Sequence, residues 1–249
     1  MKDKKEIAKL ISGELKKANI KSTLDVIAKE LEKEKTDKLH FTKTTILNSI
    51  GQELGKIIFK EDWKYTRLLE LWKEGKRDEK LIVISALERI SKKDYEHSKQ
   101  FVLNVLEDIS DWEICDQMAL RVTVNLAVQN QKELFSLMEQ WVMSENKWIR
   151  RLAIATIPPY IRATKTESKI CLDFLDKTMR ESDRDVQKAI AWALREITKK
   201  SPISVFEFLQ KWATVDDKNT KWIIKEGMKK LPEEEQQKLK SLIRNEYGQ

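Results

Sequence analysis

Residues that form tight turns are scarce in this sequence. Its 249 residues include only 6 glycines and 4 prolines, which argues against β-barrels, β-sandwiches and glycine-rich nucleotide-binding folds. Cysteine is equally rare, and the two thiols of Cys115 and Cys171 cannot build a disulfide framework. The two histidines, His40 and His97, lie far apart and no metal-ligand spacing is present. We therefore expect neither a metal site nor a cofactor.

Long apolar runs are also missing. The charged N-terminus is followed by no apolar stretch long enough for a signal peptide or a membrane span. Together with the few cysteines, this predicts a soluble protein of a reducing, intracellular compartment, with no membrane partner. The expected location is the cytoplasm, in association with the nucleoid if the source is prokaryotic.

Charge and aromatic residues are plentiful. Charged residues make up 36% of the chain, and 8 Trp, 7 Phe and 4 Tyr supply bulk for a sizeable core. Lys and Arg outnumber Asp and Glu by 48 to 41, and residues 147–249 carry that whole excess with 22 basic and 15 acidic residues. One interpretation is a basic surface facing an anionic partner. The other is the ordinary solvated face of lysine-rich helices.

The spacing of apolar residues predicts helices along the whole chain and no strands. Three helices are expected within residues 4–60, with a polar loop over residues 33–40. Gly51 and Gly55 in the third of them permit either a close contact with another helix or a break.

A helix-pair repeat begins at about residue 63. Five segments rich in β-branched and small residues start at positions 83, 121, 152, 189 and 223, so their starts are 38, 31, 37 and 34 residues apart. This period is typical of HEAT or armadillo α-solenoids, whose helices stack and present a concave face. We predict one all-α solenoid domain over residues 1–249, with HEAT-like repeats over residues 63–232 and a concave basic face.

Residues 110–116 combine a helix start with an aromatic ring and an acid. Ser110 and Glu113 fit a capping box, which puts Trp112 in the first turn and Asp116 four residues later on the same face. Such a pair suits a cationic ligand, because the ring offers cation–π attraction and the carboxylate offers charge. In the alternative, Trp112 fills the core between repeats and Asp116 is a solvated or dipole-favoured acid.

A second tryptophan falls on the basic face of the helix predicted over residues 186–200. Opposite its apolar stripe lie, at helical spacing, Lys188, Trp192, Arg195 and Lys199. A ring in such a row suits contact with a nucleic-acid sugar or base, with phosphates on the cations. The alternative is that Trp192 packs against a neighbouring repeat.

A third basic cluster opens a helix after residue 146. Its members are Lys147, Trp148, Arg150 and Arg151. Arginine forks suit phosphate oxygens, but salt bridges between the helices of a solenoid are the competing interpretation. The row Lys221, Lys225 and Lys229 near the C-terminus either extends this basic track or is plain solvated surface.

With these motifs together, the sequence resembles the AlkD-like HEAT-repeat alkylpurine DNA glycosylases, also called DNA alkylation repair enzymes. The resemblance covers about residues 63–232 and is best in residues 112–116, 144–154 and 186–196. Asp111 departs from the asparagine usual before the tryptophan in this family. Residues 1–60 show no convincing match.

The resemblance implies a catalytic role for Asp116, with Trp112 and Trp192 framing the deoxyribose of the lesion and Arg151 holding the backbone beside it. The implied reaction is hydrolysis of the N-glycosidic bond of an N3- or N7-alkylated purine in duplex DNA. An alkylated purine is cationic and leaves readily, so the carboxylate need only stabilise an oxocarbenium-like sugar. The base need not enter a deep pocket.

We expect a monomer without a small-molecule cofactor. The remaining expected DNA contacts are Arg150, Lys147, Trp148, Lys188, Arg195 and Lys199. Two alternatives stay open: a DNA-binding scaffold of the same fold without catalysis, and a HEAT module whose basic face binds an acidic protein.

Overall fold

The computed structural model describes residues 3–32, 41–165 and 168–244. Within these ranges the chain forms helices and no strands, which confirms the all-α class predicted from the apolar spacing. The polar loop predicted over residues 33–40 lies outside the described residues. None of the described helices is long and apolar enough to cross a membrane.

The chain folds into two compact units. The N-terminal unit comprises Met1–Asp108 and Arg121–Gln129, and the C-terminal unit comprises Ile109–Leu120 and Asn130–Gln249. The chain crosses between the units three times, after Asp108, Leu120 and Gln129, and the second crossing lies in a short π-helical segment, η2 (Ala119–Thr123). The expectation of one continuous domain with a concave basic face stays a prediction.

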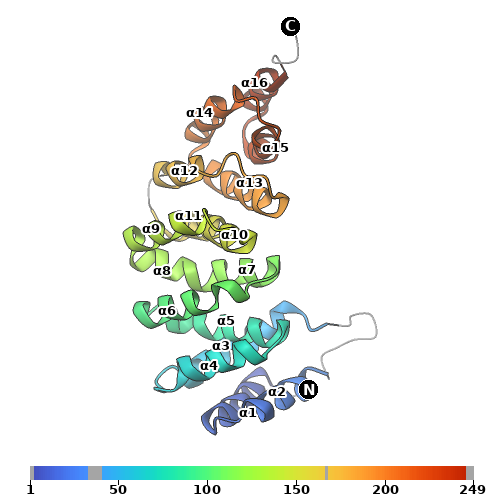
Figure 1. Cartoon of the computed structure of the whole chain (residues 1–249), viewed down its shortest axis with the longest axis vertical. Helices are drawn as coiled ribbons and strands as arrows, with labels where there is room; N and C mark the ends of the chain where they lie inside the picture. The colour runs from blue at the N-terminus through green and yellow to red at the C-terminus, as the bar shows by residue number, and fades with distance from the viewer. Residues whose placement is uncertain (1–2, 33–40, 166–167, 245–249) are drawn as a thin grey trace. The chain divides into compact units, whose positions relative to one another are not determined.

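Helices of the N-terminal unit pack in two layers (Figure 1). Their bounds are α1 (Lys4–Lys16), α2 (Ile20–Glu32), α3 (Thr44–Ile58), α4 (Lys64–Glu74), α5 (Arg77–Ser91), α6 (Tyr95–Val105), η1 (Leu106–Asp108) and α8 (Val124–Gln129). In one layer α3 packs on both α1 and α5, and in the other α4 packs on α2 and α6. The three helices expected before residue 60 are confirmed as α1, α2 and α3.

The glycines of α3 serve a close helix contact and not a break, because α3 runs through both of them. A Cβ atom at Gly51 would collide with the Ile82 carbonyl oxygen and the Ser85 side chain, and one at Gly55 would collide with the Ala86 backbone. The absence of side chains at these two positions therefore sets how closely α3 approaches α5.

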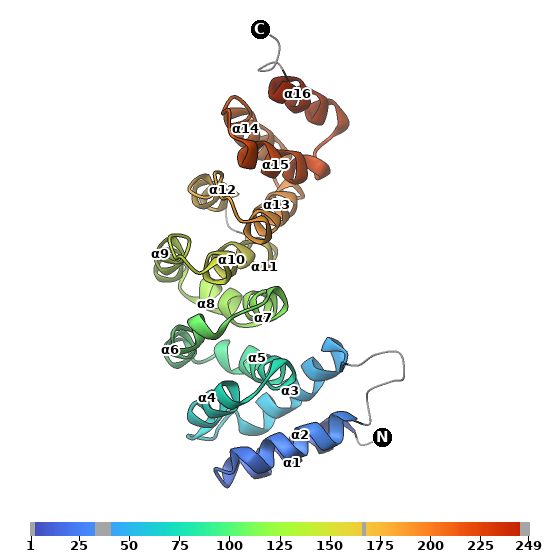
Figure 2. The same ribbon diagram turned by 45° about the vertical axis from the view of Figure 1, so that its right-hand side comes forward.

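The C-terminal unit also has two layers of helices (Figure 2). Its elements are α7 (Trp112–Met118), α9 (Gln131–Trp141), α10 (Lys147–Ala155), α11 (Ile157–Ala163), α12 (Ser168–Asp176), α13 (Arg184–Thr198), α14 (Pro202–Ala213), α15 (Lys218–Gly227), η3 (Met228–Lys230) and α16 (Glu233–Arg244). In one layer α7 packs on α10, α10 on α13 and α13 on α15; in the other α12 packs on α14. We call the first layer the α7–α15 row.

Small buried residues allow the helices of the α7–α15 row to stack closely. Ala153, Ala189 and Ala193 are fully buried on α10 and α13, as the recurrent small residues of the sequence predict. Cys115 and Cys171 are buried free thiols, in agreement with the expectation of no disulfide.

Each helix of the α7–α15 row begins at a capping Asp or Asn. Asn146, Asp183 and Asp217 accept hydrogen bonds from main-chain N–H groups in the first turns of α10, α13 and α15. Such caps satisfy amides that have no partner within the helix, and they fix where each helix starts. The starts of α10 and α13 lie together, because Lys147 at the first position of α10 donates to Asp185 in the first turn of α13.

The capping box expected at Ser110 is wrong. Asp111 is the N-cap of α7, and its Oδ1 accepts from the amides of Glu113 at 2.8 Å and Ile114 at 3.0 Å. A carboxylate accepts these bonds with a full charge beside the positive end of the helix dipole. Asp and Asn cap helices about equally well, so Asp111 fits the position where the resembled family has asparagine.

Candidate functional site

Asp116 on α7 and Arg151 on α10 form a bidentate ion pair. Arg151 donates from Nε to Oδ1 at 2.9 Å and from Nη2 to Oδ2 at 2.7 Å. Its Nη1 donates to the main-chain oxygen of Asp185 at the start of α13. The Arg151 side chain is only 8% exposed and that of Asp116 17%. One guanidinium thus ties three successive helices together and fixes the orientation of the carboxylate.

Electrostatics keep Arg151 charged at this contact. Burial lowers the pKa of its guanidinium, but the hydrogen bonds and the charge of Asp116 outweigh burial, so the pKa is raised. Three of its five N–H donors are used within the protein. Each oxygen of Asp116 keeps acceptor capacity for a further ligand.

Trp112 lies one turn before Asp116, as the sequence predicts, and it does not fill the core. It is the first residue of α7, and 60% of its surface is exposed. An indole this exposed loses no packing when it binds a ligand. The interpretation of Trp112 as a core residue between repeats is therefore wrong.

Trp192 lies on α13, two turns beyond Asp185, and is half-buried. The apolar stripe predicted for this helix is confirmed, since Val186, Ile190 and Leu194 are fully buried. The Trp192 ring therefore lies outside the buried apolar stripe and is only partly exposed to solvent. Its link to Asp116 runs through the packing of α10 on α13 and the bond from Arg151 to Asp185.

Asp185 is a site residue that the sequence motifs did not single out. Its carboxylate accepts from Lys147 Nζ at 2.9 Å and from Lys188 Nζ at 3.2 Å. These two hydrogen bonds, that from Lys147 foremost, lower the pKa of Asp185 below its ordinary value. The sequence held one signal for this residue: Asp185 is an acid in the first turn of a helix, three residues before Lys188 of the basic row.

Arg150 is held inside the protein. It donates from Nε to Glu181 Oε2 at 2.8 Å, and its Nη1 donates to the main-chain oxygens of Ser144 and Glu145 at 2.8 and 2.9 Å. Its side chain is 17% exposed and that of Glu181 is 10% exposed. This geometry matches the interhelix salt bridge that competed with a phosphate contact.

Arg195 and Lys199 are not brought to the ion pair. Arg195 donates to the main-chain oxygen of Glu226 at 3.0 Å, and Lys199 pairs with Glu196 at 2.6 Å. At about 1.5 Å per residue they lie about 15 to 20 Å beyond Asp185 along α13. The basic row of α13 therefore extends away from Asp116, and only its first members are near it.

Trp148 contacts the site residues through its main-chain carbonyl group. Its carbonyl oxygen accepts a weak hydrogen bond from Cys115 Sγ at 3.5 Å, and Lys147 Nζ lies 4.6 Å from the centre of its ring. Burial first, and then the Asp116 charge, raise the pKa of the Cys115 thiol well above its ordinary value. Cys115 is thus a neutral packing residue beside the site.

Two further residues extend this surface and were missed in the sequence motifs. Arg184, the first residue of α13, stacks over the ring of Trp222 on α15 at 4.0 Å from its centre.

In the described ranges, no three His, Cys, Asp or Glu side chains are grouped so that they could hold a metal ion.

Comparison with known proteins adds the family. The sequence model of the family described as "DNA alkylation repair enzyme" matches residues 11–231. The chain belongs to this family. The motifs that carry the resemblance lie in residues 63–232, whereas the family model begins at residue 11. Most of the α1–α3 region is therefore part of the DNA alkylation repair fold. No curated protein matches the sequence.

Solved structures share the helical-repeat fold of this DNA alkylation repair family member. Two are from Streptococcus mutans: smu.31 of strain UA159 has a TM-score of 0.59 at 15% identity, covering 73% of this chain and 92% of that one. AlkD2 has a TM-score of 0.59 at 16% identity, covering 73% and 88%.

A third similar structure is the Pseudomonas fluorescens alkylpurine DNA glycosylase AlkC bound to DNA containing an abasic site analog. Its TM-score is 0.56 at 15% identity, and the match covers 90% of this chain. This chain accounts for 62% of the length of the AlkC chain. At such identities the likeness shows the fold, which is the HEAT-like helical repeat expected from the period of the sequence.

Proposed function

We propose that this chain is an alkylpurine DNA glycosylase, a monomer without a cofactor that hydrolyses the N-glycosidic bond of cationic N3- or N7-alkylated purines in duplex DNA. The observation that carries the proposal is the oriented, ionised pair of Asp116 and Arg151, one helical turn from the exposed ring of Trp112. Membership of the DNA alkylation repair family and the likeness to a DNA-bound glycosylase structure support it.

In the proposed reaction the bond between C1′ of the deoxyribose and the purine nitrogen breaks, and its electron pair neutralises the cationic base. The sugar becomes an oxocarbenium-like cation. Asp116 stabilises this cation by charge, and an attacking water forms the new C1′–O bond while its proton passes to Asp116 or to solvent. A base that leaves as a neutral molecule needs no general acid.

The two indoles complete the proposed site. Trp112 on α7 and Trp192 on α13 would approach the sugar from the two helices that flank α10, and their electron-rich faces attract the positive charge that develops on it. The exposure of Trp112 favours this, because a duplex can reach the ring without rearrangement of the core.

Arg151 acts in this proposal chiefly as a positioning residue. It holds Asp116 through two of its donors, and its two unused donors leave it able to take a phosphate oxygen next to the lesion. Among the other predicted contacts, Lys147 and Lys188 form partly exposed ion pairs with Asp185, and the exposed Lys199 pairs with the buried Glu196. The ammonium groups of these lysines can exchange their carboxylate partners for DNA phosphates when a duplex binds.

Two other predicted contacts fit less closely. Arg195 and Trp148 are half-buried and would contact DNA only through part of their surface. Arg150 is the weakest of the proposed contacts, because hydrogen bonds within the protein engage its Nε, Nη1 and Nη2 groups.

The test is release of free base from a duplex that contains 7-methylguanine. We expect the wild-type chain to release it and Asp116→Asn to lose release while still binding the duplex. Glu181→Gln is the matched control, because it removes the charge from a similarly buried acid paired with an arginine of the same helix. Base release by Asp116→Asn at the wild-type rate would remove Asp116 from the reaction.

The DNA-binding scaffold without catalysis has one observation in its favour, which is that the charge of Arg151 is paired with that of Asp116. The same assay separates the two functions. A wild-type chain that binds methylated duplex and releases no base is a scaffold.

A further inference from the structure

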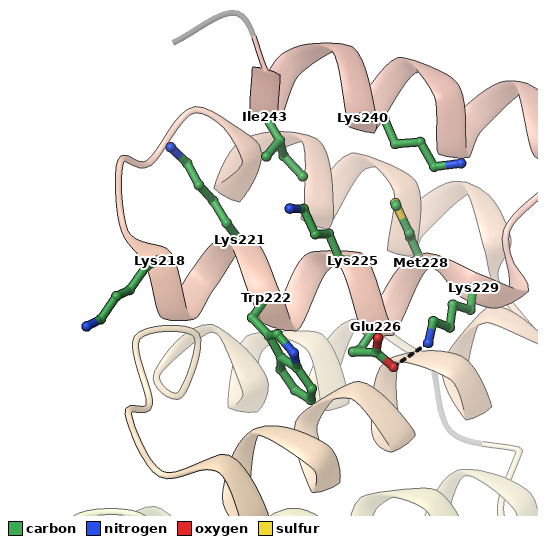
Figure 3. A pocket seen from close by; sticks show the side chains of 9 residues that line it. All are labelled: Lys218, Lys221, Trp222, Lys225, Glu226, Met228, Lys229, Lys240 and Ile243. Atoms are coloured by element: carbon green, nitrogen blue, oxygen red, sulfur yellow. Dashed lines mark hydrogen bonds and ion pairs between the residues drawn. The ribbon is translucent and has the colours of Figure 1, made fainter. Parts of the chain in front are cut away.

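The α15–α16 groove is a second basic site at the C-terminal end of the α7–α15 row. It has a volume of about 760 Å³. Five of its lining side chains are lysines, namely Lys218, Lys221, Lys225, Lys229 and Lys240, against one glutamate, Glu226 (Figure 3). None of the motifs that carry the proposed reaction lies in this groove.

Three of these lysines are available to a ligand. Lys221 is bound to Asp216 at 2.7 Å and Lys229 to Glu226 at 2.6 Å. In the part of the chain that the structure describes, no carboxylate pairs with the three others, which are Lys218, Lys225 and Lys240. An uncompensated cluster of cations raises the local concentration of an anionic partner.

The α15–α16 groove is the most basic of three grooves compared in the C-terminal unit; a smaller one, of about 220 Å³, has Arg150, Lys177 and Arg180 against Glu181. The groove between α12 and α14, in the other layer of the same unit, has a volume of about 560 Å³ and also contains two lysines, Lys169 and Lys211. There, three acids outnumber them: Asp173, Asp176 and Glu207. A uniformly lysine-rich surface would charge these grooves alike, so the size of the excess is a local feature of α15 and α16.

A stacked arginine connects the α15–α16 groove to the candidate site. Trp222 lines the groove, and the guanidinium of Arg184 lies over its ring. The next residue in the chain, Asp185, accepts a hydrogen bond from Arg151 at its main-chain oxygen. Stacking holds a guanidinium in one plane and leaves its N–H donors at the edge, an arrangement suited to phosphate oxygens.

The lysines of α15 are spaced widely enough to contact more than one phosphate of a strand. Lys218 and Lys225 are seven residues apart on α15, which is about 10 Å along the helix. Successive phosphates of one strand are farther apart than their rise of about 3.4 Å along the axis, because the backbone winds around it, so the row can reach about two neighbouring phosphates. Lysines serve as point charges for phosphates and need no fixed geometry.

We propose that the α15–α16 groove binds the sugar–phosphate backbone of duplex DNA on one side of the lesion, with Lys225 and Lys240 as its main contacts and stacked Arg184 between it and the reacting site. This inference rests on the proposed function for its choice of DNA over other polyanions. It requires no lesion in the bound segment, because phosphate contacts carry no sequence information.

The experiment measures binding of a fluorescein-labelled, unmodified 25-base-pair duplex to the full chain by anisotropy, over a series of salt concentrations. For Lys225→Gln/Lys240→Gln we expect about tenfold weaker binding and a log K against log salt slope that is shallower by about 2. Lys169→Gln/Lys211→Gln, which removes the same charge from the α12–α14 groove, should keep the wild-type affinity and slope.

Thermal melting of all three proteins checks that the fold is intact, and Lys218→Gln/Lys225→Gln provides a second pair should the first fail to fold. Equal losses in the two grooves would overturn the proposal, since net charge alone would explain them. Unchanged duplex binding with lost binding of poly-L-glutamate would overturn it in favour of an acidic protein.

Because the probe carries no lesion, this outcome is independent of base release. If the groove variants bind the duplex as the wild type does, the glycosylase proposal still stands. Failure of base release with intact, groove-dependent duplex binding leaves the groove in place on a scaffold.

Discussion

Arg151 binds both carboxylate oxygens of Asp116, and the two residues lie 35 positions apart on neighbouring helices. The arginine is the more buried of the two, so the carboxylate lies on the outer side of the pair. The orientation of Asp116 therefore depends on a residue that reaches it from inside the helix stack. This dependence has measurable consequences for any reaction at Asp116.

Arg151→Lys keeps the charge beside Asp116 but loses the planar fork that fixes both oxygens. We expect base release to fall about 100-fold, because small misplacements of a catalytic group have effects of this size. Single-turnover kinetics on methylated duplex measure it. Arg150→Lys is the matched control on the same helix, and an equal loss in both variants would show that helix packing, not the position of Asp116, is responsible.

Trp112→Ala should reduce base release at least tenfold while leaving the fold unaffected. The side chain is 60% exposed, and substitutions at exposed positions change stability by about 0.5 kcal/mol or less. Thermal unfolding and single-turnover excision, measured on the same preparation, separate the two effects. A loss of several degrees in melting temperature would contradict the exposed placement of this ring.

Gly55→Ala should destabilise the protein by about 1–3 kcal/mol, because the added methyl group meets the Ala86 backbone at the contact of α3 and α5. Gly13→Ala is the internal control, since a Cβ there meets nothing within 4 Å. That variant should gain about 0.5–1 kcal/mol from helix propensity. Urea unfolding measures both, and effects of the same sign would refute the close contact.

Asp185→Asn should make stability less sensitive to acid. Hydrogen bonds from Lys147 and Lys188 lower the pKa of Asp185 from its ordinary 3.8. The folded chain therefore releases this proton more readily than the unfolded chain. The stabilisation is full above the ordinary pKa and is lost as pH falls through the lowered one.

The measurement is the melting temperature of wild type and Asp185→Asn across the acid range. The two proteins should differ most near neutral pH, and their curves should converge as the pH falls below the ordinary pKa of an aspartate. A difference that stays constant with pH would show that the charge of Asp185 does not contribute to its role at the start of α13.

Local features of the site could be predicted from sequence. Trp112 and Asp116 share a face because they are four residues apart in one helix, and α10 begins at Lys147 because Asn146 caps it. The prediction of Ser110 as the cap of α7 was wrong, because the adjacent Asp111 is an equally good capping residue and occupies that position.

The sequence by itself determined the all-α class, the repeat period and the turn-by-turn placement of the aromatic and basic residues, because these follow from short-range periodicity. The tertiary structure decided which cation meets which acid. Arg150 and Arg151 are adjacent in the chain, yet one binds Glu181 and the other Asp116. That assignment depends on how each helix is rotated against its neighbours, and packing of the whole row sets this rotation.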